Sequence, residues 1–179
     1  LLGLGTVGGG TYRVLRRNAQ LIADRAGRRI EISMVAVRDM ERAVAVVDDD
    51  VTLTDDPFQV VQHPDLDVIV ESIGGTTIAR ELVLLAIAAG KHVVTANKAL
   101  LALHGTEIFS AARAQGVMVA YEGAVAVSIP IIKALREGLT ANRINWVAGI
   151  INGTTNFILS EMKSNGLDFD TALQEAQRK

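Results

Sequence analysis

The feature that most constrains the fold of this 179-residue chain is the glycine-rich stretch LLGLGTVGGG at residues 1–10. Its glycines Gly3, Gly5 and Gly8 fit the pattern G-x-G-x-x-G. Between a strand and a helix, these glycines permit a tight turn, let backbone approach a pyrophosphate and allow close helix-to-strand packing. The same glycines also fit a tight turn that binds nothing, so the sequence that follows has to decide between the two.

The sequence after the glycines predicts a strand–helix–strand unit. Apolar residues step by three and four at Tyr12, Leu15, Ala19, Ile22 and Ala26, which indicates one amphipathic helix. The stretch EISMVAVRD at 31–39 is rich in β-branched and apolar residues, as a second strand would be. A helix and a strand therefore follow the turn in the order that dinucleotide binding requires.

The alternation continues to about residue 123. Asp56 and Pro57 are an N-cap and a first helical residue, and further helices are predicted at 78–90 and 106–116. Strands are predicted at 66–75, 91–98 and 117–123. Apolar strands separated by helices are typical of a parallel sheet covered on both faces, so we predict an α/β, Rossmann-like doubly wound fold.

The regular alternation of strands and helices changes after residue 123, and we predict two domains, 1–123 and 124–179. The second part reads as a helix at 128–139 with Ser128 as N-cap, a strand at 144–153 and a helix at 154–166. The chain begins inside an apolar run and ends inside a helical pattern, so we expect both termini to be cut relative to the natural product.

Composition narrows the class of ligand and compartment. The net charge is −2, which favours neither nucleic acid nor an anionic membrane as partner, so a small molecule is expected. The chain has no cysteine, which excludes disulfides and thiolate chemistry. It has neither an apolar run of about 20 residues nor a secretory signal, and we expect a cytoplasmic protein.

The end of the second predicted strand bears on the choice of nicotinamide cofactor. Arg38 can pair with a 2′-phosphate, whereas the neighbouring Asp39 can bind a ribose 2′-hydroxyl. We predict NADP with NAD as the alternative, and a solvated charged turn is the remaining interpretation.

Further candidate residues lie at the carboxyl ends of the other predicted strands. Parallel sheets bind ligands at these ends, which places Gly74, Thr95 and Lys98 beside the cofactor. A lysine there can donate to a carbonyl oxygen or, when deprotonated, take a proton from an alcohol. A solvated lysine leaving a strand is the alternative interpretation of Lys98.

Several motifs together resemble the bacterial type of homoserine dehydrogenase: GLGTVGGG, AVRD, VVTANKALLA, IPIIKALREGL and GIINGTTNFIL. This resemblance implies reversible conversion of L-homoserine to L-aspartate 4-semialdehyde with NADP or NAD, on the pathway to threonine, methionine and isoleucine. It also implies that residues 124–179 begin an α+β domain for substrate binding and dimerisation, and that the protein is a homodimer.

The resemblance also assigns residues. It implies cofactor contacts at Thr6, Val7, Arg38 and Lys98, with Lys98 also close to the reacting oxygen of the substrate. It implies substrate contacts at Gly153 and Thr154, although Thr154 is equally suited to capping a helix. It implies a sodium or potassium ion held by oxygens of Glu122, Val125, Val127 and Ile129, mostly main-chain carbonyls, and hard oxygen ligands suit such an ion.

Two departures from the family pattern matter. The family usually has two glycines where this chain has Val127 and Ser128, and valine does not adopt positive φ cheaply. The family's remaining substrate carboxylate, aspartate and second lysine would lie beyond Lys179, so the active site in this sequence is incomplete. Two alternatives therefore stay open: a dehydrogenase of another semialdehyde, and an NADP-binding sensor or assembly module without catalysis.

Overall fold

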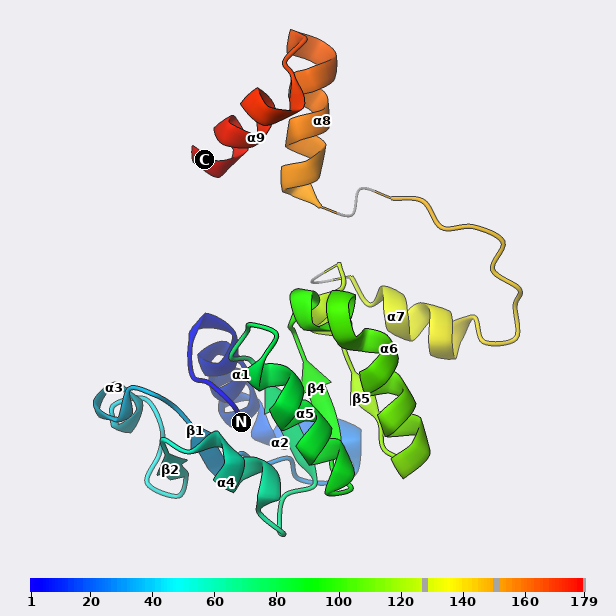
Figure 1. Cartoon of the computed structure of the whole chain (residues 1–179). Coiled ribbons are helices and arrows are strands. Elements are labelled where there is room, and N and C mark those ends of the chain that lie inside the picture. The colour runs from blue at the N-terminus through cyan, green and yellow to red at the C-terminus, as the bar shows by residue number, and fades with distance from the viewer. Residues whose placement is uncertain (127–128, 150–151, 179) are drawn as a thin grey trace. The chain divides into compact units, whose positions relative to one another are not determined.

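The computed structural model describes residues 1–126, 129–149 and 152–178 of the chain. It divides into two compact units, Leu1–Ile132 and Lys133–Lys179, and each is described separately (Figure 1). The first unit is an α/β fold and the second is helical in its described part.

The first unit is built on parallel strands. β1 (Met34–Ala36) pairs with β2 (Thr52–Thr54), and β3 (Val68–Glu71) pairs with β4 (His92–Thr95), which pairs with β5 (Val119–Ala120). Leu2 joins the two groups, because it forms parallel bridges to Ala36 on one side and Glu71 on the other. The spatial order is therefore β2, β1, Leu2, β3, β4, β5, with the glycine turn directly after the central position.

Alternate side chains of the strands enter two separate cores. Met34, Ala36 and Ile69 belong to a core shared with the helices α4 (Pro57–Gln62), α5 (Ile78–Ala88) and α6 (Lys98–Gln115). Val35 and Val70 belong to a second core with Tyr12 of α1 (Thr6–Arg17). Because successive strand residues point to opposite faces, both faces of the sheet are covered, and the predicted doubly wound α/β class is confirmed.

The ends of the helices follow from local side-chain chemistry, and two of the predictions about them are wrong. Asp56 accepts the amide of Phe58 at 2.9 Å and Pro57 begins α4, as predicted. The prediction of one continuous first helix is wrong, because the helix breaks at Asn18 into α1 and α2 (Ala19–Ala26). The predicted start of a helix at residue 106 is also wrong, since Asn97 caps α6 by accepting the amide of Leu100 at 3.1 Å. Shorter elements, α3 (Met40–Val44) and the 3-10 turn η1 (Glu122–Ala124), lie in the connections.

The region after residue 123 differs most from expectation. The predicted helix at 128–139 is a short α7 (Ile131–Lys133) followed by a π-helical turn, Ala134–Gly138, and Ser128 lies outside the described residues. The predicted strand at 144–153 is wrong for residues 144–149, which are irregular and exposed. A strand needs a partner to satisfy its amides and carbonyls, and the described part of the second unit contains no strand.

The second unit ends in two packed helices. α8 (Gly153–Asn165) and α9 (Phe169–Arg178) bury Ile158 and Ala172 respectively. Asn152, not Thr154, caps α8 by accepting the amide of Thr155 at 2.9 Å, as the stronger capping preference of asparagine favours. None of the described helices in either unit has the length and apolarity that crossing a bilayer requires.

Candidate functional site

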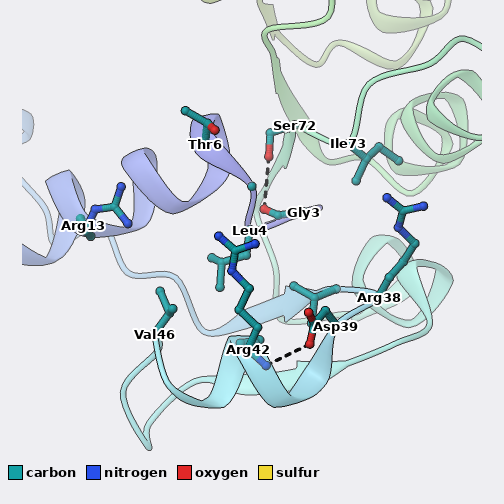
Figure 2. A pocket seen from close by; sticks show the side chains of 13 residues that line it. Gly3, Leu4, Thr6, Arg13, Arg38, Asp39, Arg42, Val46, Ser72 and Ile73 are labelled. Carbon is teal, nitrogen blue, oxygen red and sulfur yellow. Dashed lines mark hydrogen bonds between the residues drawn. The ribbon is translucent and has the colours of Figure 1, made fainter.

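A pocket of about 470 Å³ lies beside the glycine turn (Figure 2). It is bordered by the turn itself and the first turns of α1, by the end of β1 with α3, and by Ser72 and Ile73 after β3. These are the carboxyl ends of neighbouring parallel strands, the edge at which open α/β sheets bind ligands. The pocket therefore lies where the glycine pattern predicts a dinucleotide.

Gly3 and Gly8 are required by backbone geometry. Gly3 has φ of +89°, a conformation that side chains rarely adopt. A Cβ atom on Gly8 would lie 2.1 Å from the carbonyl oxygen of Gly3 and 2.6 Å from the hydroxyl of Ser72. The first glycine thus makes the turn, and the third lets α1 pack against it.

Gly5 is different, because a Cβ atom there would meet nothing within 4 Å. It is the N-cap of α1 and has no side chain to cap the first amides of the helix. The first bond of α1 runs from the amide of Gly9 to the carbonyl oxygen of Gly5 at 2.8 Å. The amides of Thr6, Val7 and Gly8 therefore have no acceptor within the helix and project from its N-terminus, whose positive partial charge suits an anion.

Ser72 holds the turn against the next strand. Its amide donates to the carbonyl oxygen of Leu2 at 3.0 Å, and its hydroxyl lies 2.8 Å from that oxygen and 3.2 Å from the carbonyl oxygen of Gly3. Figure 2 shows the contact with Gly3 at the rim of the pocket. The turn is thus fixed from β3 before any ligand binds.

The end of β1 brings charge to the pocket. Arg38 and Asp39 both line it, as does Arg42 of α3. The carboxylate of Asp39 accepts the amide of Arg42 at 3.0 Å and caps α3. Asp39 is the acid that would bind a ribose hydroxyl, and one of its two carboxylate oxygens is therefore already hydrogen-bonded within the protein.

A buried network, which sequence reasoning missed, connects the ends of β3 and β4. Glu71 is fully buried, and its carboxylate accepts the amides of Ile73 and Gly74 at 3.0 Å each and the hydroxyl of Thr95 at 2.6 Å. The same hydroxyl oxygen accepts the amide of Asn97 at 3.0 Å. The signal was an acid at the end of an otherwise apolar strand, DVIVESIGG.

Asn97 extends this network to the loop after β3. Its side-chain amide donates to the carbonyl oxygen of Gly75 at 2.6 Å, while its oxygen caps α6. Gly74 has φ of +74°, so the loop uses the conformational freedom of glycine. The network thereby ties the loop at 72–75 to the start of α6.

The network also determines where the predicted residues Thr95 and Lys98 lie. Thr95 is buried and its hydroxyl is used by Glu71. Lys98 is the first residue of α6 and is exposed, and it does not line the pocket beside the glycine turn. The structure thus groups Gly3, Gly5, Thr6 and Arg38 around one pocket and places Lys98 at a neighbouring strand end.

The predicted cation loop is described in part. Glu122 begins η1, and its carboxylate accepts the amide of Ile132 at 2.9 Å. The carbonyl oxygens of Glu122 and Ile129 accept amides of Val125 and Ile131, at 3.2 and 2.8 Å. Val127 lies outside the described residues, and the positive φ described in this loop belongs to Ala126, at 45°. Within the described ranges, no group of three or more histidines and acids is arranged to hold a metal.

The predicted substrate contacts Gly153 and Thr154 begin α8 in the second unit, directly after its cap Asn152. Both are exposed. They lie at a helix N-terminus, whose amides suit an anionic group such as a carboxylate.

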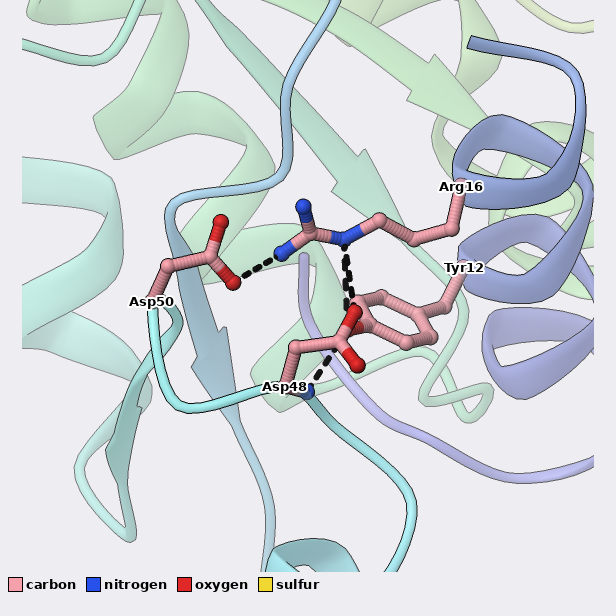
Figure 3. A network of polar contacts seen from close by, with 4 residues as sticks. All are labelled: Tyr12, Arg16, Asp48 and Asp50. Atoms are coloured by element: carbon pink, nitrogen blue, oxygen red, sulfur yellow. Dashed lines mark hydrogen bonds and ion pairs between the residues drawn. The ribbon is translucent and has the colours of Figure 1, made fainter.

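A polar network joins α1 to Asp48 and Asp50 (Figure 3). The hydroxyl of Tyr12 donates to the carboxylate of Asp48 at 2.8 Å and accepts the amide of Asp48 at 2.8 Å. Arg16 lies over the Tyr12 ring and pairs with both Asp48 and Asp50. The hydrogen bond from Arg16 lowers the pKa of the Asp50 carboxyl below its ordinary value.

Comparison with known proteins agrees with this geometry. The family model described as the NAD-binding domain of homoserine dehydrogenase matches residues 3–122, and the model described as homoserine dehydrogenase matches residues 130–179. The two matches meet near the division of the chain into its compact units.

Individual relatives extend the same similarity over nearly the whole chain. Homoserine dehydrogenase of Pseudomonas aeruginosa is 61% identical across 99% of this chain, and that of Methylobacillus glycogenes is 56% identical across 99%. A crystal structure of a homoserine dehydrogenase from Thiobacillus denitrificans has a TM-score of 0.84 with 64% identity and covers 99% of this chain. The chain spans 40%, 43% and 41% of these three proteins respectively.

Proposed function

Because the chain belongs to the homoserine dehydrogenase family, we propose that the full-length protein interconverts L-homoserine and L-aspartate 4-semialdehyde with a nicotinamide dinucleotide. The observation that supports this most directly is that the three glycines of the turn have different surroundings and backbone conformations. Gly3 makes the turn, Gly8 admits close packing, and Gly5 leaves open space where a pyrophosphate would approach.

The residues of the pocket fit such a cofactor. The leading amides of α1, at Thr6, Val7 and Gly8, are suited to the pyrophosphate oxygens. Gly74 lies in the loop after β3 and Thr95 is the last residue of β4, and the nicotinamide half would lie beside these strand ends. When bound, the cofactor supplies the hydride acceptor or donor, and the protein supplies alignment and the handling of a proton.

We assign that proton handling in part to Lys98. The side chain is exposed at the start of α6, close in sequence to the network of Glu71, Thr95 and Asn97 that fixes this end of the helix. From there an ammonium group can donate to the substrate oxygen during reduction, and the amine can accept its proton during oxidation. Gly153 and Thr154 are proposed to contact the substrate from the second unit.

We propose NADP as the preferred cofactor and NAD as the weaker one. Arg38 borders the pocket, and its guanidinium group suits a 2′-phosphate. Asp39, which would favour the 2′-hydroxyl of NAD, already accepts the amide of Arg42. Both features favour the phosphorylated cofactor.

A sodium or potassium ion is proposed at the loop of Glu122, Val125, Val127 and Ile129. Main-chain carbonyls and one carboxylate are the hard oxygen donors that such an ion requires. The proposed reaction belongs to threonine, methionine and isoleucine biosynthesis, which we place in the cytoplasm. A homodimer is proposed on the family resemblance.

The test is NADP⁺ reduction by the full-length protein with L-homoserine at mildly alkaline pH, alongside Lys98→Ala and Lys98→Arg. Activity that requires homoserine and falls in Lys98→Ala supports the assignment. Lys98→Arg keeps the charge but does not release a proton readily, so full oxidation activity in this variant would remove Lys98 from proton transfer. Tight NADPH binding without turnover would instead favour a cofactor-binding module.

A further inference from the structure

Asn97 links three separate elements at the carboxyl end of β4. Its main-chain amide donates to the hydroxyl of Thr95, the last residue of the strand, at 3.0 Å. Its side-chain amide donates to the carbonyl oxygen of Gly75, in the loop after β3, at 2.6 Å. Its side-chain oxygen accepts the amide of Leu100, in the first turn of α6, at 3.1 Å. One buried side chain thereby connects the loop after β3 to the start of the helix that Lys98 begins.

The double use of the Asn97 side chain sets it apart from two other helix caps of the first unit. Asp39 and Asp56 cap α3 and α4 with a carboxylate, which only accepts hydrogen bonds when ionised. A cap requires only an acceptor, and aspartate or serine caps a helix as well as asparagine does. The bond to Gly75 requires a donor, and an asparagine side chain carries a donor and an acceptor together. Capping alone therefore does not account for an asparagine at this position.

The place of Lys98 depends on these bonds. Lys98 follows Asn97 directly and is exposed, whereas Leu100 is fully buried in the core of the first unit. The core thus holds the helix from Leu100 onward, and the bonds of Asn97 hold the turn before it. Loss of the bond to Gly75 would loosen the residue that begins α6 and leave the rest of the helix in place. A displacement of about 1 Å at a reacting group can lower a rate about a hundredfold.

The part of the loop after β3 that borders the pocket is held by other bonds. The amide and the hydroxyl of Ser72 donate to the main chain just before the glycine turn, and the amide of Ile73 donates to Glu71. Ser72 and Ile73 line the pocket, whereas Gly75 and Asn97 do not. Loss of the bond between Asn97 and Gly75 should therefore leave dinucleotide binding intact.

We propose that Asn97 is a positioning residue for the proposed reaction, because it holds the first turn of α6 against the loop after β3 and so sets the place of Lys98. Asn97 acts through Lys98 and is assigned no contact with the reacting atoms. The inference rests on the proposed function, since it assumes that Lys98 exchanges a proton with the substrate. It adds a residue whose role follows from its contacts with the loop and the helix rather than from a sequence pattern.

The experiment measures kcat for homoserine-dependent NADP⁺ reduction and the Kd of NADPH in the full-length protein and in Asn97→Ser. Serine keeps an acceptor for the cap, but its side chain is shorter and should not reach the carbonyl oxygen of Gly75. We expect kcat to fall about tenfold and the Kd of NADPH to change less than about twofold, because Lys98 is displaced and the pocket is not.

The matched control is Asn18→Ser, which makes the same exchange between α1 and α2, at an asparagine whose side chain forms no cap hydrogen bond. It should change neither kcat nor the Kd. Asn97→Asp is a second variant, which keeps the cap and the size of the side chain and loses the donor. It should also lower kcat, and it replaces Asn97→Ser if the serine variant does not fold.

A double-variant comparison tests whether the effect passes through Lys98. In the Lys98→Ala background, Asn97→Ser should lower kcat by less than about twofold, because the side chain to be positioned is gone. Long incubations with quantified product measure these slow variants. An equally large loss with and without Lys98 indicates a general structural role and would overturn the inference.

The remaining outcomes separate this inference from the proposed function. If the unmodified protein does not reduce NADP⁺ with homoserine, both fail. If it does, and a folded Asn97→Ser or Asn97→Asp matches its kcat, the positioning role alone fails. A Kd of NADPH that weakens as much as kcat falls would also overturn it, because the contact would then serve cofactor binding. Full activity of Lys98→Ala would remove the positioning role and the assignment of Lys98 while leaving the dehydrogenase activity established.

Discussion

The hydroxyl of Thr95 donates to the buried carboxylate of Glu71 at 2.6 Å and so joins the carboxyl ends of β4 and β3. Two amides of the following loop donate to the same carboxylate. The loop at 72–75 and the start of α6 therefore depend on one acid that has no contact with solvent.

Replacing Glu71 should destabilise the fold. Glu71→Gln keeps the shape but turns one acceptor oxygen into a donor amide, so the Thr95 hydroxyl loses its acceptor and the bonds from the loop amides lose their charge assistance. We expect the free energy of unfolding to fall by about 1–3 kcal/mol. Glu71→Leu leaves the amides of Ile73 and Gly74 without an acceptor and should cost more. Urea unfolding measures both, with the exposed Glu31→Gln as control. Equal stability of Glu71→Leu and the unmodified protein would contradict the role of the network.

The neighbouring glycines of α1 should respond in opposite directions. Gly8→Ala places a methyl group 2.1 Å from a carbonyl oxygen, and we expect a loss of about 1–3 kcal/mol as the packing shifts. Gly10→Ala meets nothing within 4 Å in the same helix and should stabilise by about 0.5–1 kcal/mol through helix propensity. Thermal unfolding of the two variants gives the comparison, and a stabilised Gly8→Ala would be incompatible with the packing described.

Gly5→Ala should separate folding from binding. The added methyl group has open space, so stability should fall by less than about 1 kcal/mol, the loss expected from a poorer N-cap. The same methyl group would occupy the approach path of a pyrophosphate, and we expect NADPH affinity to fall at least about tenfold. Calorimetric titration with NADPH checks this, with Gly10→Ala as the matched control. Unchanged affinity in Gly5→Ala would mean that no phosphate approaches this position.

Acid should weaken the contact between α1 and the loop at 48–50. Arg16 lowers the pKa of Asp50 below its ordinary value of 3.8, so the folded protein holds this carboxylate ionised more firmly than the unfolded chain does. That stabilisation is complete above about pH 5 and is lost as pH falls through the lowered pKa. Asp50→Asn should flatten the fall in unfolding free energy over this acid range, as measured by urea unfolding at several pH values.

The matched control for this experiment is Asp49→Asn, which removes an adjacent acid that forms no ion pair with an arginine among the described residues. It should leave the acid profile as it was. An identical profile for Asp50→Asn and the unmodified protein would show that the ion pair does not contribute in solution.

Local patterns predicted the first unit well, because its elements are set by short-range chemistry. The glycine turn, the N-cap at Asp56 and the alternation of strands and helices all follow from residues that lie close together in the sequence. The start of α6 was misplaced because Asn97 was not recognised as a cap, although its side-chain oxygen bonds an amide three residues on. The break at Asn18 interrupts an apolar period that continues beyond it.

Contacts between residues that lie far apart in the chain could not be predicted from the sequence patterns. Nothing near Glu71 in the chain indicates that Thr95, 24 residues away, will donate to it. Arg13 of α1 and Arg42 of α3 line the same pocket beside the glycine turn, which periodicity does not show. The stretch at 144–149 has the composition of a strand but no described strand in its unit to pair with.

The bridging position of Leu2 has a consequence for dynamics. Its amide donates to Val70 while that of Gly3 donates to Ala36, at 2.8 and 2.9 Å, so two amides couple the halves of the sheet just before the turn that faces the pocket. Local opening of this seam would release the turn and both flanking strands together. Hydrogen–deuterium exchange at these two amides should therefore slow when a ligand occupies the pocket, even though both amides already donate to strand carbonyls.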